Sequence, residues 1–255
     1  MIEYSNVSFI RDGRKIIEDV SFKINKGENW AILGPNGSGK STLFSMLMAY
    51  TIASKGSIKA FGVEFGKGNW NRVKDKVGIV SSTMDKFNEV FYRQSVFDIV
   101  LSGIKKTIGI YEEVKDFEIA KTREYIKQFS LEDLEDKNYR NLSQGEKKKV
   151  LIVRSLISNP EILILDEPCA SLDLYQKESL LKFLQEIEEE TNIIYITHDI
   201  NEIMPFITNI MLIKEGRIFK AGLKENILTD ENLSNLYDLN VKLEWNRGRA
   251  WVKLS

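Results

Sequence analysis

The chain has 255 residues, 43% of them hydrophobic and 29% charged, a balance that excludes a disordered chain and suffices for one large domain or a domain with an inserted lobe. The 36 Lys and Arg residues against 37 Asp and Glu residues give a net charge of -1, without the basic excess of a chain held mainly by nucleic-acid phosphates. The single cysteine, Cys169, excludes an internal disulfide, and no group of Cys and His residues marks a zinc site.

The N-terminus and the apolar runs indicate where the chain works. Residues 1–6 have neither the basic start nor the apolar core of a signal peptide. No apolar run is long enough to span a bilayer, since even residues 192–213 are interrupted by polar residues and a proline, namely His198, Asp199, Asn201, Glu202 and Pro205. We therefore expect a cytoplasmic chain in a reducing compartment, peripheral at the inner face of the cell membrane if a partner holds it there.

Strand-like alternation opens the chain. It covers residues 2–9 and 16–24, with the turn-forming residues 11–14 between them. These two segments predict an N-terminal antiparallel β subdomain. The short apolar segment 29–33 then predicts a buried strand, and the helical spacing of apolar residues over 42–48 predicts a helix.

A glycine-rich segment, residues 33–42, joins that strand to that helix. It matches the pattern G-x-x-x-x-G-K-[ST] in the strand, turn and helix setting that the pattern requires. Glycines allow backbone N–H groups to approach an anion, Lys40 supplies a cation for β- and γ-phosphates, and Ser41 a hydroxyl for Mg²⁺. The segment predicts a nucleoside triphosphate site made of Gly34, Pro35, Asn36, Gly37, Ser38, Gly39, Lys40, Ser41 and Thr42.

The middle of the chain changes character. Residues 56–62 and 77–80 predict two further strands. From about residue 84 to residue 140 the chain is rich in charge with apolar residues at helical spacing, which we interpret as an inserted α-helical lobe. The α/β alternation then resumes with a helix over 141–158, a strand over 161–165, a helix over 174–190 and a strand over 192–197, and residues 241–254 predict a small hairpin.

Two strand ends carry candidate catalytic residues. Asp166 and Glu167 follow the strand 161–165. In a P-loop fold the C-terminal end of a neighbouring strand lies beside the phosphates. Asp166 is therefore expected to hold Mg²⁺, and Glu167 to take a proton from the attacking water. Strand-end acids that merely meet solvent are the alternative. His198, the only histidine, follows the strand 192–197, and we interpret it as a contact to the γ-phosphate or the water rather than a structural histidine.

The segment 142–146 supports two compatible interpretations. Ser143 and Glu146 form an S-x-x-E capping box that begins a helix. The same helix start suits an anion, because Gly145 allows close approach of the backbone. The lysine run 147–149 that follows is interpreted as solvated helix surface.

Taken in order, the motifs resemble a family. The glycine-rich loop, the segment 142–146, the Asp166 strand end, residues 171–173 and the strand before His198 resemble the nucleotide-binding subunits of ABC ATPases over nearly the whole chain. The resemblance implies an α/β P-loop NTPase core with a mainly parallel sheet, made of residues 1–83 and 141–225. Residues 84–140 would be the helical subdomain, and residues 226–255 a C-terminal extension with the hairpin. The residues of these motifs are most similar to those of a soluble bacterial subgroup of the molybdenum-transport and photorepair type.

The resemblance also implies a dimer, either a homodimer or a heterodimer of cassettes. Each ATP is trapped between the glycine-rich loop of one cassette and the segment around Ser143 of the other. Carried over, Ser143 and Gly145 face the γ-phosphate bound by the other cassette, and Asp173 crosses the interface. Lys40, Glu167 and His198 are the implied catalytic residues, and ATP and Mg²⁺ are the implied cofactors.

Three positions depart from the family pattern. Ser82 stands where a glutamine usually touches Mg²⁺, and it keeps a hydroxyl for a metal-bound water but loses reach, which weakens the expected coupling to a membrane partner. Arg11 stands where an aromatic residue usually stacks on adenine, and it either stacks on the base or is an exposed turn residue. Glu146 brings a negative charge close to the nucleotide, while the functions of Ser143 and Gly145 survive.

The sequence thus predicts a Mg²⁺-dependent ATPase, with the energising subunit of a membrane transporter, bound to a polytopic permease, as the leading interpretation. A soluble non-transport ABC ATPase that clamps nucleic acid or a protein assembly is the alternative. The charge balance does not favour nucleic acid as a partner but does not exclude it. A binding-only switch is a third interpretation. Cys169 and the tryptophans are interpreted as packing residues, the latter being Trp30, Trp70, Trp245 and Trp251.

Overall fold

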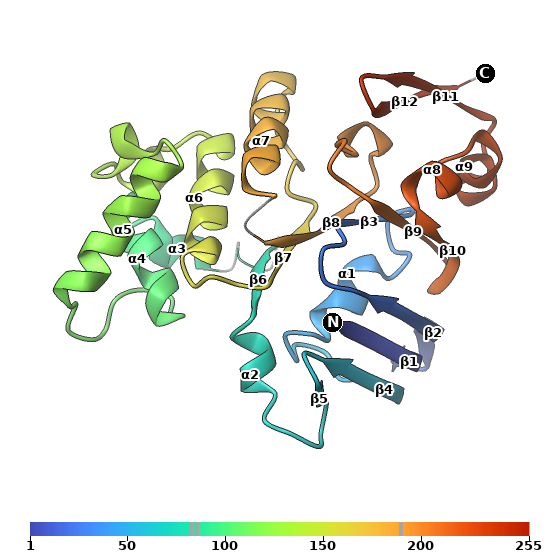
Figure 1. The fold of residues 1–255 in the computed structure, drawn as a ribbon, viewed down its shortest axis with the longest axis horizontal. Helices are drawn as coiled ribbons and strands as arrows, with labels where there is room; N and C mark the ends of the chain where they lie inside the picture. Colours follow the sequence, from blue (N-terminus) through green and yellow to red (C-terminus); the bar gives the residue numbers. More distant parts are fainter. Residues whose placement is uncertain (82–83, 85–86, 189–190, 255) are drawn as a thin grey trace. The chain divides into compact units, whose positions relative to one another are not determined.

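The computed structural model describes residues 1–81, 84, 87–188 and 191–254 (Figure 1). Contacts within the chain divide it into two units, the first made of Met1–Val77 and Asn192–Ser255 and the second of Gly78–Thr191. The finer division at residues 83, 140 and 225 stays a prediction. Over the described residues, no helix is long and apolar enough to cross a membrane.

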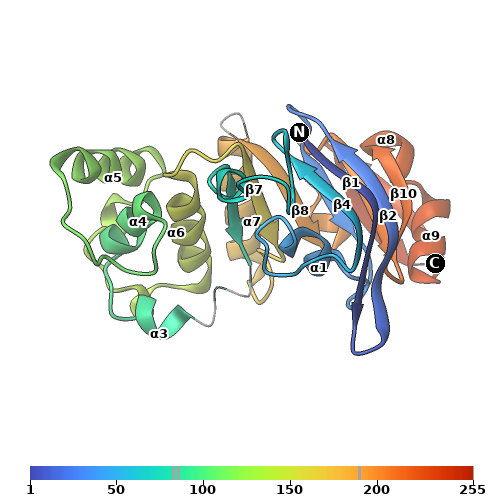
Figure 2. The ribbon, with the colours of Figure 1, turned by 90° about the horizontal axis from the view of Figure 1, so that it is seen from below.

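An antiparallel sheet in the first unit confirms the predicted N-terminal strands. Strands β1 and β2 form a long hairpin, and β4 lies beside β1 (Figure 2). The sheet order is β2-β1-β4-β5. Asp12 and Gly13, with φ of 50° and 74°, form the hairpin turn, so both strands reach further toward it than predicted. Its strands are β1 (Ile2–Arg11), β2 (Arg14–Ile24), β4 (Lys55–Ala60) and β5 (Val63–Glu64).

A second set of strands in the first unit is mainly parallel, as predicted. Strand β3 (Trp30–Leu33) lies between β8 (Asn192–Thr197) and β9 (Asn209–Lys214) and is parallel to both. All four residues of β3 are buried, which explains its continuous apolar sequence. Strand β10 (Arg217–Leu223) pairs with β9 in antiparallel fashion, and neither β9 nor β10 was predicted.

Short helices and the predicted C-terminal hairpin complete the first unit. The helices are α1 (Lys40–Ser45), α2 (Asn71–Lys74), the 3-10 helix η4 (Ile200–Glu202), α8 (Lys224–Ile227) and α9 (Asp230–Tyr237). Strands β11 (Val241–Asn246) and β12 (Arg249–Leu254) pair in the predicted hairpin. Trp245 and Trp251 in this hairpin are 48% and 39% exposed, so the packing role predicted for them is wrong, whereas Trp30 and Trp70 are buried.

Tyr4 fixes helix α1 against the antiparallel sheet. Its buried hydroxyl donates to the backbone carbonyl of Leu43 at 2.9 Å, and its ring stacks on Phe22 with a centroid separation of 4.5 Å. Burial raises the pKa of Tyr4, so its hydroxyl stays protonated and able to donate. The helix that follows the glycine-rich loop is therefore held by a residue of the first strand.

Among the described residues, the second unit holds two strands and most of the helices. Strand β6 (Val77–Val80), which starts at the boundary, and β7 (Ile162–Asp166) are hydrogen-bonded neighbours. Both were predicted from their apolar sequence. The helices are α3 (Asn88–Phe91), α4 (Val96–Lys105), α5 (Asp116–Gln128), η2 (Glu132–Leu134), η3 (Tyr139–Asn141), α6 (Gln144–Leu156) and α7 (Leu174–Ile187).

Helices α4 and α6 approach closely in the second unit. A β-carbon at Gly103 would collide with the backbone carbonyl of Arg154, so only glycine fits there. The Arg154 guanidinium crosses the contact, because Nε donates to Ser102 Oγ at 3.0 Å and Nη2 to the Thr107 carbonyl at 2.7 Å. The helical spacing of Val96, Ile99 and Val100 therefore marked a buried helix face correctly.

Candidate functional site

The glycine-rich loop begins directly after β3 and ends in α1. A β-carbon at Gly34 would collide with the carbonyl of Ile213, and one at Gly39 would lie 2.6 Å from Cδ1 of Ile17. Gly37 and Gly39 have φ of +79° and +98°, a left-handed conformation that other residues rarely adopt. The loop is therefore held tightly on both sides, and its glycines are required by the fold.

Two buried polar side chains of this loop suit an anion. Lys40 is only 5% exposed, and its ammonium donates to the carbonyls of Gly34 at 2.8 Å and Pro35 at 3.1 Å. Ser38 is also 5% exposed, and its hydroxyl has no hydrogen-bond partner among the described residues. Because a buried hydroxyl without a partner costs free energy, phosphate oxygens would complete this loop, and the residues present fit that group.

His198 leaves the sheet at the same end as this loop. Leu33 pairs with Thr197 in the parallel register of β3 and β8, so the chain turns into the loop at Gly34 and into His198 at the adjacent strand end. The carboxyl ends of neighbouring parallel strands form binding crevices in α/β sheets. The first unit thus brings the exposed His198 and the glycine-rich loop to one sheet end.

A turn that was not predicted supports the loop from the other side. Gly216, between β9 and β10, donates its N–H to the carbonyl of Ser38 at 3.1 Å, and its carbonyl accepts from the N–H of Glu18 at 2.9 Å. A local signal was present in the sequence, because Gly216 follows the apolar run 210–213 within three residues and glycine favours the positive φ that a tight turn requires.

Arg11 lies at the tip of the first hairpin. It is the last residue of β1, is exposed, and is paired across the turn with Arg14. Adenine stacking by Arg11 stays a prediction.

The second unit places the two carboxylates at the end of β7. Asp166 is the last strand residue and Glu167 the next, and both are half-buried. Glu167 has a φ of 50°, an unfavourable conformation for a residue other than glycine, which the surrounding structure must hold in place. Cys169, two residues later, is 5% exposed, in agreement with its predicted packing role.

The starts of α6 and α7 lie together in the second unit. Ser143 Oγ accepts from the N–H of Glu146 at 3.3 Å, and Glu146 Oε2 accepts from the N–H of Ser143 at 2.7 Å, which confirms the predicted capping box. A β-carbon at Gly145 would lie 3.3 Å from Cβ of Gln176, whose N–H donates to Asp173 Oδ1 at 2.8 Å. The structure therefore brings the exposed Ser143 and Asp173 close together, with the buried Gly145 at the contact between the two helix starts.

The lysines after this capping box are less solvated than predicted. All three of the run 147–149 are half-buried. The ammonium of Lys147 lies over the rings of Tyr92 and Tyr139, and that of Lys149 donates to Ser179 Oγ at 3.0 Å. Lys147 and Lys149 thus hold the helix within its unit.

The predicted metal ligands are distributed over the two units. Ser41 is exposed in the first turn of α1, Asp166 belongs to the second unit, and Ser82 lies outside the described residues. Within the described ranges, no group of three His, Cys, Asp or Glu side chains is arranged to hold a metal ion. Hydroxyl and carboxylate oxygens are ligand types that Mg²⁺ accepts alongside phosphate oxygens, and a site shared by Ser41 and Asp166 stays a prediction.

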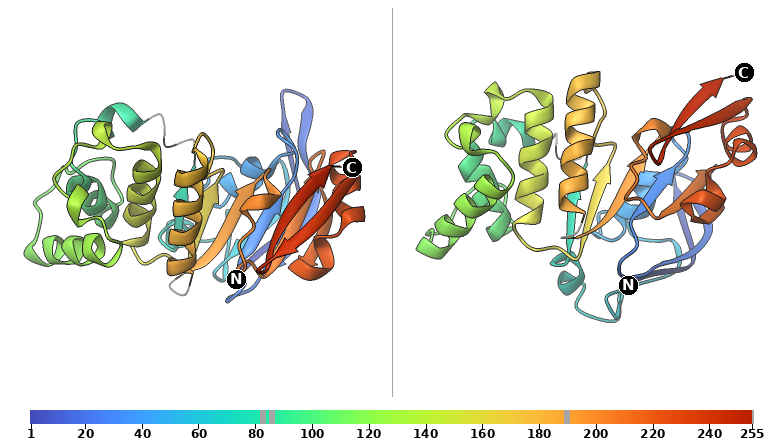
Figure 3. Two further views of the ribbon diagram at one scale, coloured as in Figure 1. Left: turned by 90° about the horizontal axis from the view of Figure 1, so that it is seen from above. Right: turned by 45° about the horizontal axis from the view of Figure 1, so that its top comes forward.

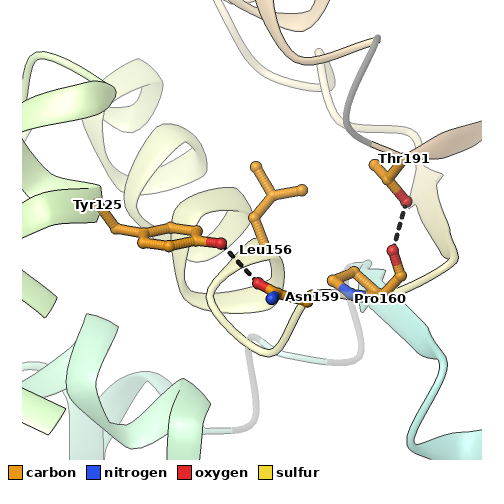
Figure 4. Close-up of a pocket in the computed structure, with 5 residues that line it drawn as sticks. All are labelled: Tyr125, Leu156, Asn159, Pro160 and Thr191. Carbon is orange, nitrogen blue, oxygen red and sulfur yellow. Dashed lines mark hydrogen bonds between the residues drawn. The ribbon is translucent and has the colours of Figure 1, made fainter. Parts of the chain in front are cut away.

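A pocket of about 370 Å³ in the second unit is separate from these residues (Figure 4). Its polar side chains are already paired, because Tyr125 donates to Asn159 Oδ1 at 2.6 Å and Thr191 to the Pro160 carbonyl at 2.9 Å. With Leu156 these four residues line it, and none of them is a predicted site residue.

Comparisons with known proteins agree with the motifs. A family model described as "ABC transporter" matches residues 17–170. The chain is 35% identical to an uncharacterized ABC transporter ATP-binding protein, YlmA of Bacillus subtilis, over 99% of this chain and 96% of the relative. It is 28% identical to CbiO1 of Clostridium perfringens, part of the ABC transporter complex CbiONQ, with a TM-score of 0.77 and 92% of each chain covered.

A third structure shares the fold. It is a dimeric ATP-binding cassette in a post-hydrolysis state bound to ADP and Pi, with 24% identity, a TM-score of 0.70, and 88% of this chain and 98% of that chain covered. The predicted α/β P-loop NTPase fold is confirmed. The molybdenum-transport and photorepair subgroup stays a prediction.

Proposed function

The chain belongs to the family of ABC transporter ATP-binding proteins, and we propose on this premise that two such cassettes form a dimer with two shared nucleotide sites. The chain is an ATPase that energises a membrane transporter. The observation that carries its nucleotide site is the tight loop after β3, with a buried lysine and a buried hydroxyl that needs a partner, at the same sheet end as His198.

In this proposal the glycine-rich loop and three residues outside it bind the nucleotide and its metal ion. Backbone N–H groups of residues 34–42 and the Lys40 ammonium bind the β- and γ-phosphates. Ser41 and Asp166 hold Mg²⁺, the hydroxyl of Ser82 serves a metal-bound water, and Mg²⁺ when bound neutralises charge on the phosphate oxygens. Arg11 contacts the adenine.

The remaining residues act on the γ-phosphate. Glu167 accepts a proton from the attacking water, and His198 contacts the γ-phosphate or that water. Ser143, Gly145 and Asp173 belong to the nucleotide site of the other cassette. The closeness of the starts of α6 and α7 in the second unit supports this division, because the exposed Ser143 and Asp173 could reach the partner site together.

The partner that the transporter needs is a polytopic permease, which would hold this chain at the inner face of the cell membrane. The transported substrate is then selected by the permease, not by the cassette. CbiO1, a member of a transporter complex, is similar to this chain over 92% of its length. A dimer that clamps nucleic acid is the outcome that would contradict this proposal.

Purification from membranes tests the partner. We expect a tagged chain extracted in detergent to carry along a multi-span membrane protein that, in proteoliposomes, supports ATP-dependent flux. The Glu167→Gln variant is the matched control, because it should bind the same permease and support no flux. If the chain is recovered without a membrane protein, and nucleic acid stimulates its hydrolysis, the proposed permease partner is wrong.

A further inference from the structure

The C-terminal part of the first unit holds the segment that follows β8. Tyr237 at the end of α9 donates its hydroxyl to the backbone carbonyl of His198 at 3.1 Å. In the hairpin, Arg249 Nε donates to the carbonyl of Asn201 at 2.6 Å, and the N–H of Val252 donates to Asn201 Oδ1 at 3.2 Å. The hairpin is drawn in red in Figure 3. We name residues 230–254 the C-terminal clasp.

We propose that Tyr237 and Arg249 are positioning residues for His198, and that the C-terminal clasp sets how fast the cassette hydrolyses ATP. The proposal rests on the role of His198 at the γ-phosphate given above. It assigns a function to helix α9 and the hairpin of β11 and β12, which contain no residue of the proposed nucleotide site.

The backbone after β8 explains why such a clasp is needed. The parallel register with β3 ends at Thr197, and His198 lies beyond it. The next residues form a turn built on local side-chain bonds, since Asp199 N–H donates to Thr197 Oγ1 at 3.0 Å and Asn201 N–H donates to Asp199 Oδ1 at 2.9 Å. Local bonds alone leave such a turn able to open, so the contacts that it makes with the rest of the unit fix its geometry.

Tyr237 acts on the peptide plane that joins His198 to Asp199. Because a peptide group is planar, a hydrogen bond to its carbonyl restrains the rotation of that plane. The restrained rotation is the ψ angle of His198, which sets how the residue is presented at the sheet end. The tyrosine is half-buried and is 39 positions away in the chain, so this restraint exists only in the folded clasp.

Arg249 holds the other end of the turn. Its guanidinium lies over the ring of Trp251 with 4.7 Å to the centroid, which orients Nε toward Asn201. This contact gives the exposed Trp251 a role that is not core packing. Glu202, next to Asn201, is buried and accepts from Tyr195 at 3.0 Å and Thr197 at 2.7 Å, so the turn is joined back to β8.

Helix α9 is also attached to the strand on the other side of β3. Lys214, the last residue of β9, donates to the Asn235 carbonyl and to Asp238 Oδ1, both at 2.7 Å. Asp238 is 77% exposed, so this ion pair contributes little stability. It nevertheless places the end of α9 across the ends of β9 and β8, which flank the strand that precedes the glycine-rich loop.

Steady-state hydrolysis by the full-length chain tests the proposal with Tyr237→Phe, which removes only the hydroxyl. We expect kcat to fall about 3- to 10-fold, the effect of one lost hydrogen bond, with KM for ATP unchanged and the thermal midpoint lowered by no more than about 2–4 °C. Arg249→Lys, which keeps the charge but loses the planar fork, should act in the same direction. Tyr125→Phe, which removes a tyrosine hydroxyl from the second unit, should leave kcat unchanged.

The same substitutions in a His198→Ala background separate the two proposals. If Tyr237 acts through His198, Tyr237→Phe should have no further effect there. If His198→Ala lowers kcat but Tyr237→Phe has no effect in the wild type, or lowers kcat equally in both backgrounds, the clasp proposal is wrong and the role of His198 stands. If His198→Ala leaves kcat unchanged, the role of His198 fails and the clasp proposal with it.

Discussion

Replacing Glu167 with Gln is expected to lower kcat for ATP hydrolysis by about 10²- to 10⁴-fold, because glutamine keeps the shape of the side chain but cannot take a proton from water. Binding of ATP should persist, since the phosphate-binding loop is unchanged. The half-buried position and the φ of 50° of Glu167 fix the direction of its carboxylate. Phosphate release measures turnover, and a fluorescent ATP analogue measures binding.

Glu161→Gln is the matched control. Glu161 is also half-buried, but it precedes β7 whereas Glu167 follows it. Its substitution should leave kcat unchanged. Wild-type hydrolysis by Glu167→Gln would show that another group is the base, whereas equally little turnover by the wild type and both variants would favour a binding-only switch.

Replacing Lys40 with Ala is expected to weaken ATP binding by about 10- to 100-fold, the range for a lost hydrogen bond to a charged group. The lysine is 5% exposed, and the Gly34 and Pro35 carbonyls hold its ammonium inside the loop. The Lys40 ammonium therefore lies in the loop that is expected to bind the negatively charged β- and γ-phosphates. Equilibrium titration with ATP measures the change.

Two controls accompany this variant. Lys26→Ala removes an exposed lysine from the turn before β3 and should leave ATP affinity unchanged. Thermal unfolding without nucleotide shows whether Lys40→Ala remains folded, because the substitution also removes the partner of two carbonyls. Unchanged affinity in a folded Lys40→Ala variant would mean that the loop does not bind the phosphates.

Local sequence signals were enough for most of the fold, whereas the roles of the site residues stay predictions. The strand β6 was predicted with its observed ends because its apolar residues are bounded by polar ones, and the capping box of Ser143 was predicted because both partners lie within one helical turn. The loop of residues 34–42 could be predicted for the same reason, since strand, loop and helix are consecutive.

Long-range contacts explain what could not be predicted. The start of β9 depends on Asn29, whose carbonyl accepts from the N–H groups of Thr208 and Asn209 at 2.9 and 3.0 Å, and no pattern near residue 209 indicates this. The exposure of Trp251 depends on which hairpin face is buried. Its cross-strand partner is the exposed Glu244, whereas the neighbouring Ala250 is buried. The bond from Tyr237 to His198 likewise joins segments 39 residues apart.

The central claim, that each nucleotide site combines residues of two cassettes, is tested most directly by mixing two inactive variants of the chain, Lys40→Ala and Gly145→Asp. A mixed dimer holds one site with both defects and one site with neither, so the mixture should regain up to about a quarter of wild-type hydrolysis, while each variant alone stays inactive. If the loop and the Ser143 segment of one chain formed the site together, no mixture would contain an intact site. Absence of recovered hydrolysis in a mixture shown to contain mixed dimers would contradict the account.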